Sequence, residues 1–199
     1  IARLQEVLSV GQHRRPTGLQ FGGTEPEASN RIVREIARGE TRGARRIVWI
    51  DVHTGLGPFG VPELITELLP TDPVYHRGRR WYGDAFRSTR AGESVSAALT
   101  GVIETGLSEA VEPGAELTPF TAEFGTVPAD RVFWALRADN WLHHHGEPES
   151  ERGVAIRREL LEVFRPSDPA WGRAVLGSGL EIVRGACDGL TRDAASPGS

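Results

Sequence analysis

Trp49-Ile50-Asp51-Val52-His53-Thr54-Gly55-Leu56-Gly57 is the stretch of sequence around which the rest of the chain is predicted to fold. Together with Ile47 and Val48 it reads as a strand that is apolar almost throughout, which is typical of a central parallel strand covered on both faces. Asp51 and His53 are two residues apart, so on a strand their side chains lie on one face. The glycines then turn the backbone. The sequence therefore predicts a carboxylate and an imidazole at the carboxyl end of a strand, where open α/β sheets bind ligands.

The roles of these two side chains stay open on this evidence alone. His53 is either a structural histidine, hydrogen-bonded to Asp51 or to a loop carbonyl, or a functional one, because imidazole serves both as metal ligand and as acid–base group. Asp51 either orients that imidazole, as a carboxylate that contacts the ring without binding the ligand itself, or only caps the turn.

A second stretch with chemistry in it runs from Leu117 to Phe124. Its residues alternate with a period of two, which predicts a short strand, and Pro119 favours an edge position or the first residues of that strand. Glu123 lies at the end of the strand, and Gly125 follows the strand. The alternative is that Glu123 is a solvated glutamate, since most glutamates are exposed.

One domain is expected over residues 1–190, with a flexible tail over 191–199. We expect residues 71–92 to form a long polar excursion over the surface, and residues 94–110 are ambiguous. Helices are expected at residues 24–39, 62–69, 128–145 and 150–164, and from Asp168 onwards.

Composition limits the classes of protein. With 39% hydrophobic and 25% charged residues the chain has the make-up of a soluble globular protein. A net charge of −4 argues against a nucleic-acid partner, and the absence of a long apolar run argues against a membrane span. Cys187 is the one cysteine, which suits a reducing compartment, so a cytoplasmic location is expected. The composition, rich in Arg and Ala and without Lys, indicates a bacterial source.

Two other features invite a chemical interpretation that the sequence does not favour. The run His143-His144-His145 precedes Gly146 and is better explained as the solvated end of a helix, where the helix dipole favours basic groups. Cys187 is expected to pack on an apolar helix face rather than to act as a nucleophile.

The blocks Gly11-Gln12-His13, Phe21-Gly22-Gly23, Asp51 to Gly57 and Glu123-Phe124-Gly125-Thr126 resemble a bacterial family of unknown function that is similar to the zinc carboxypeptidases. The resemblance implies an α/β/α sandwich around a mixed, mostly parallel sheet, and one catalytic zinc ion. It implies that His53 is the third zinc ligand, that Glu123 is the general base, and that Asp51 supports His53. The substrate implied is a small peptide or an acylated, amino-acid-like molecule.

The His-x-x-Glu motif that supplies the first two zinc ligands in such enzymes is absent from this sequence. The chain is therefore expected to be the C-terminal part of such a domain, with its N-terminal part missing and half of the site with it. Two functions remain: a zinc-dependent amide or peptide hydrolase, or a non-catalytic binding module that has lost its metal. In either case we expect His53 and Glu123 to lie roughly within the radius of a zinc site.

Overall fold

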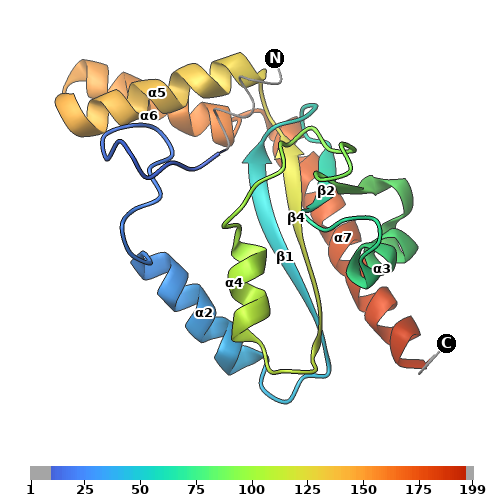
Figure 1. Ribbon diagram of the computed structural model, residues 1–199. Coiled ribbons are helices and arrows are strands. Elements are labelled where there is room, and N and C mark those ends of the chain that lie inside the picture. Colours follow the sequence, from blue (N-terminus) through green and yellow to red (C-terminus); the bar gives the residue numbers. More distant parts are fainter. Residues whose placement is uncertain (1–9, 196–199) are drawn as a thin grey trace.

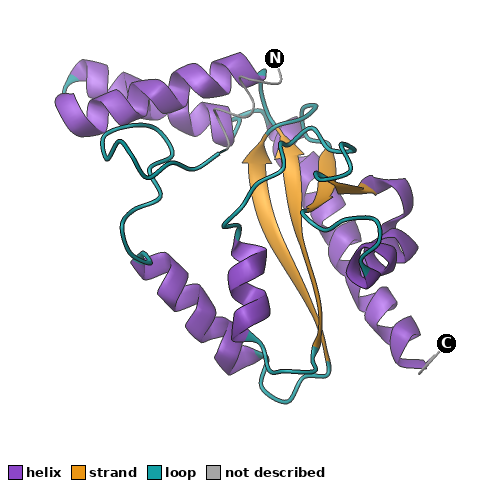
Figure 2. Ribbon diagram, viewed as in Figure 1, coloured by secondary structure: helices purple, strands orange, loops and turns teal. Residues whose placement is uncertain are grey.

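The computed structural model describes residues 10–195, and it is an α/β fold with helices on both faces of one open sheet (Figures 1 and 2). The strands are β1 (Arg46–Gly55), β2 (Pro62–Thr66), β3 (Phe86–Ser88) and β4 (Glu116–Gly125). The helices are α2 (Ala28–Glu40), α3 (Pro73–Tyr82), α4 (Ile103–Ala110), α5 (Ala129–His145), α6 (Glu151–Phe164) and α7 (Pro169–Ala195), with a 3₁₀ turn at Gly83–Ala85.

The sheet is mixed and mostly parallel, with the strand order β1-β4-β2-β3. β1 pairs in parallel with β4 over their whole length, and β2 pairs in parallel with β3, whereas β2 and β4 are antiparallel. The β1–β4 register sets His53 directly opposite Glu123, and the β2–β4 register sets Glu63 opposite Glu123 from the other side. Three strands thus bring His53, Glu123 and Glu63 into one row.

The two faces of the sheet are covered by different helices. On one face, α3 and α7 pack on an aromatic core that includes Phe86, Phe120 and Phe124, all at most 1% exposed. On the other, α2 and α4 cover Ile47 and the amino-terminal half of β1 and β4. The expected α/β/α layering is confirmed. In Figure 1, α2 and α4 stop short of the carboxyl ends of β1 and β4.

The expected central position of β1 was wrong, and so was the edge position, one of the two alternatives for the strand that contains Pro119. Among the described residues β1 pairs only with β4 and lies at the end of the sheet, while β4 lies between β1 and β2. Pro119 is tolerated in this inner strand because the pairs that join β4 to β2 run only from Thr121 to Phe124. Its missing N–H therefore removes no bond from that ladder.

For two segments the expected type of secondary structure was also wrong. Residues 62–66 form strand β2 and not a helix, and Leu64, Ile65 and Thr66 are all buried in it. The expected surface excursion contains α3 and β3. Asp72 caps α3 by accepting a hydrogen bond from the Val74 N–H at 2.8 Å, and Pro73 occupies its first turn.

The C-terminal part is more helical than expected. α7 continues to Ala195, so residues 191–195 of the expected tail are helical, and residues 196–199 lie outside the described part. Cys187 is exposed on α7 rather than packed. None of the helices between residues 10 and 195 combines the length and the apolar character needed to cross a bilayer.

Candidate functional site

His53 lies between two carboxylates at the carboxyl end of the sheet. Its Nε2 is 2.9 Å from Asp51 Oδ2, on the same strand, and its Nδ1 is 3.7 Å from Glu123 Oε2, on the neighbouring strand. The expectation that His53 and Glu123 lie close together at this edge is confirmed. Asp51 contacts the imidazole, as the orienting role requires, and does not cap the turn among the contacts described.

The turn after β1 holds Glu123 in place. The Leu56 N–H donates a hydrogen bond to Glu123 Oε1 at 2.9 Å, which leaves Oε2 facing His53. Thr126 Oγ1 donates to the Gly55 carbonyl at 3.0 Å and ties the end of β1 to the segment after β4. Gly55 has φ 148°, a value that L side chains rarely adopt, so glycine permits this close approach.

Glu123 is buried, with 7% of the residue exposed, whereas the His53 side chain is about half exposed. Burial raises the pKa of Glu123 above its ordinary value of 4.5, although the Leu56 N–H and the charge of His53 act in the opposite direction. The hydrogen bond to Asp51 raises the pKa of His53 above 6.5, against the effect of partial burial. A buried carboxylate with a raised pKa is suited to accept a proton from water near neutral pH.

A cavity of about 440 Å³ opens beside these residues, above the part of the sheet that α2 and α4 leave uncovered. Ile65 and Thr121 form its floor, and the segment leading into α4 forms its wall with Leu99, Val102 and Ile103. Its ionisable side chains are Asp51, His53, Glu67, Glu104 and Glu123. The cavity lining thus holds four carboxylates and one imidazole, and no arginine.

The sequence interpretation missed Glu67 and Glu104 as parts of this site. The available signal for Glu67 was the period-two spacing of Glu63, Ile65 and Glu67, of which the first two lie on β2 and Glu67 directly follows it. Glu104 gave no such signal, because only the packing of α4 against β4 brings it to the carboxyl ends of β1 and β4.

The chain matches, over residues 1–178, the model of a family described as "Protein of unknown function (DUF2817)". The chain belongs to this family. Neither a curated protein nor a solved structure matches it.

The side chains described in this DUF2817 chain do not by themselves fit a catalytic zinc ion. Such an ion takes three protein ligands, and within residues 10–195 no group of three or more His, Cys, Asp or Glu side chains is arranged to hold a metal. His53 contributes one imidazole, and each of its nitrogens faces a carboxylate. A metal ligand needs an unprotonated nitrogen directed at the ion.

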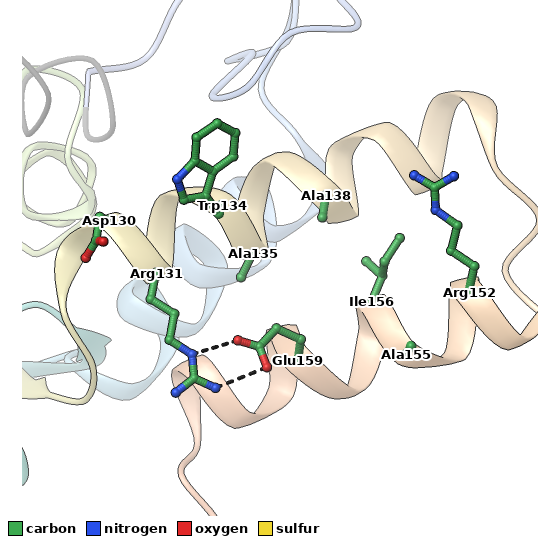
Figure 3. A pocket seen from close by; sticks show the side chains of 9 residues that line it. All are labelled: Asp130, Arg131, Trp134, Ala135, Ala138, Arg152, Ala155, Ile156 and Glu159. Atoms are coloured by element: carbon green, nitrogen blue, oxygen red, sulfur yellow. Dashed lines mark hydrogen bonds and ion pairs between the residues drawn. The ribbon is translucent and has the colours of Figure 1, made fainter.

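Other features of the DUF2817 chain offer less chemistry. A second hollow lies between α5 and α6, where Figure 3 shows Ala135, Ala138 and Ala155 between the helices and the Arg131–Glu159 ion pair across them. Arg131 and Glu159 thus neutralise each other. None of the described residues that line this hollow is a buried ionisable group. The run from His143 to His145 forms the last turn of α5, as expected.

Proposed function

We propose that this chain carries the water-activating part of a hydrolase that cleaves amide or peptide bonds, with Glu123 as the general base. The observation that carries the proposal is the placement of Glu123: a buried carboxylate, fixed at one oxygen by the Leu56 N–H, that lies beside His53 and borders a cavity. The substrate proposed is a small peptide or an acylated, amino-acid-like molecule.

In the proposed reaction Glu123 takes a proton from a water molecule as the water oxygen bonds to the carbonyl carbon of the substrate. The C–N bond then breaks, and Glu123 returns the proton to the leaving amine. Asp51 holds the orientation of His53 and favours its protonated form, which places a positive charge beside the carboxylate while that carboxylate is ionised.

Zinc is the cofactor that the family resemblance implies, and His53 is the residue proposed to bind it. Because the described side chains do not complete a zinc site, the steps above assign only what Glu123, His53 and Asp51 do. A non-catalytic binding module stays the second candidate, and the incomplete set of metal ligands between residues 10 and 195 is the observation that favours it.

The test is Glu123→Gln in the protein as its natural gene encodes it, assayed on a panel of short peptides and acylated amino acids. We expect turnover to fall by roughly 10²–10⁴-fold, because the amide cannot accept the proton. Glu116→Gln is the matched control, since Glu116 lies at the opposite end of the same strand and its side chain is 47% exposed. Full turnover in the Glu123 variant would remove Glu123 from catalysis, and loss of turnover in both variants would point to a general effect on β4.

A further inference from the structure

The charge of the cavity beside Glu123 is unbalanced. Asp51 is paired with His53, and Glu123 faces the same imidazole, so the one positive group of the lining is shared between two carboxylates. Glu67 and Glu104 line the remainder of the cavity together with apolar side chains. A cavity of about 440 Å³ lies within the range of roughly 300–1,000 Å³ that is usual for small-molecule sites.

Glu104 is the carboxylate that most needs a partner. The residue is only 8% exposed, its carboxylate receives a hydrogen bond from the backbone of Glu67, and within residues 10–195 it forms no ion pair. A buried carboxylate without a cation is costly. Glu104 lies in the first turn of α4, where the helix dipole favours the negative charge. The dipole offsets part of the cost, and it is the lack of a cation within residues 10–195 beside this buried carboxylate of the cavity lining that points to a positively charged ligand.

The wall that faces Glu104 is held in place by other groups. Glu67 Oε2 accepts hydrogen bonds from the Leu99 N–H at 3.0 Å and from Thr89 Oγ1 at 2.6 Å. These two hydrogen bonds hold Glu67 against the loop before α4. Among the described residues, the carboxylate of Glu104 has only the backbone of Glu67 as a hydrogen-bond donor. Leu99, Val102 and Ile103 offer apolar surface for the carbon chain of a ligand.

We propose that this cavity binds the cationic nitrogen of the substrate, a primary ammonium or a guanidinium group on a short aliphatic chain, with Glu104 as its principal carboxylate partner. The proposal rests on the proposed function only in calling this ligand a substrate. Glu104 is then the residue that determines specificity. Peptides or acylated amino acids with a basic side chain are the substrates that this arrangement selects.

The test compares four small probes of similar size on the chain itself by calorimetric or NMR titration at pH 8: n-butylammonium, n-butylguanidinium, n-butanol and butyrate. The two cations should bind at least roughly tenfold more tightly than the alcohol, because a charge-assisted hydrogen bond is about twice as strong as a neutral one, and butyrate should bind most weakly. Equal binding of all four probes would overturn the proposal.

Two substitutions assign the effect to Glu104. Glu104→Gln should weaken the binding of n-butylammonium by about tenfold and leave that of n-butanol unchanged, since only the charge is removed. Glu104→Asp keeps the charge and should restore part of the preference for the cation. Asp188→Asn, an exposed change on α7, is the control. An unchanged cation preference in Glu104→Gln would overturn the assignment.

The outcome is separable from that of the proposed hydrolase. If the cations bind selectively but Glu123→Gln turns over normally, the cation site stands and the general base fails. If Glu123→Gln is inactive and the four probes bind alike, the base stands and the cation site fails. Because the titrations need no turnover, an inactive chain still reports on Glu104.

Discussion

Glu104 and Glu123 are two buried carboxylates that face one cavity, and their partners give them different chemistry. Glu123 has a backbone N–H at one oxygen and an imidazole beside the other, so its charged form is supported. Glu104 has only the backbone of Glu67 and lies near other carboxylates. Burial therefore raises the pKa of Glu104 to about 7, helped by the negative charges of Glu67 and Asp51. Glu123 is suited to accept a proton, and Glu104 to bind a cation.

This difference predicts how stability depends on pH. Below the unfolded pKa of about 4.5, Glu104 is protonated in both states and costs nothing. Between about 4.5 and 7 the unfolded chain loses that proton while the folded chain keeps it, so the free energy of unfolding falls as pH rises. At 1.36 kcal/mol for each pKa unit, the loss by pH 8 is on the order of 3 kcal/mol.

Glu104→Gln cannot ionise and should escape this loss. We expect the variant and the parent to have equal stability near pH 4, and the variant to be more stable by on the order of 3 kcal/mol at pH 8. Chemical denaturation across that pH range measures the difference, with Asp188→Asn expected to stay within about 0.5 kcal/mol of the parent. Parallel pH profiles for Glu104→Gln and the parent would show that Glu104 is not destabilising when charged.

The elements of the fold divide into those with a local signal and those without one. The sequence predicted β1, β4, α5 and α6, because two local properties mark them. These are the period of their apolar residues and the glycine, proline or serine residues at their ends. α3 was missed because it contains three arginines, and its buried residues include Gly78, so its sequence resembles that of a polar loop. β2 was assigned to a helix because five residues are too few to distinguish the two periods with confidence.

The candidate site divides in the same way. Asp51, His53 and Glu123 could be predicted because each lies near the carboxyl end of a largely apolar strand, and parallel strands end at one edge. That β1 and β4 are neighbours in exact register is a tertiary fact, and it is what sets His53 opposite Glu123. Glu104 comes to the same place on a helix that starts after a loop, and nothing in its neighbours along the chain indicates that position.

Gly78 is the reason that α3 can lie so close to β3. A Cβ at this position would come 2.3 Å from Cζ of Phe86, which is fully buried. Gly78→Ala should therefore destabilise the fold by about 1–3 kcal/mol, as overpacking does, despite the better helix propensity of alanine. Denaturant titration measures this change.

Gly172→Ala is the matched control, because Gly172 also lies in a helix but its Cβ would meet nothing within 4 Å. There we expect up to about 1 kcal/mol of stabilisation from propensity alone. Equal and favourable effects at both glycines would mean that α3 is not packed on Phe86 as described.

Across the layers, the carboxyl ends of β1 and β4 are the place where covering elements are thinnest. α3 and α7 cover the aromatic core on one face, and α2 and α4 cover only the amino-terminal half of the other. β1 itself has a neighbour on one side only among the described residues. The His53 side chain is therefore about half exposed, whereas Glu123 and Glu104 are buried and border the cavity.

The small number of metal ligands leads to a prediction of how tightly this chain binds zinc. With one imidazole, and each of its nitrogens facing a carboxylate, residues 10–195 offer fewer than the three ligands that a catalytic zinc ion takes. Calorimetric titration of the chain with zinc should therefore show only weak binding, and the chain should not hydrolyse the peptide panel. Tight one-to-one binding would contradict this.

The protein as its natural gene encodes it separates the two roles proposed for His53 and Glu123. If it binds zinc, His53→Ala should lose both the metal and turnover, because it removes a ligand. Glu123→Gln should lose turnover and keep the metal, because a base on the neighbouring strand acts on water and not on the ion. Metal content by mass spectrometry, measured beside turnover for both variants, decides between these outcomes. Equal loss of metal in the two would make Glu123 a ligand, and its fixed position under the Leu56 N–H would then serve coordination rather than proton transfer.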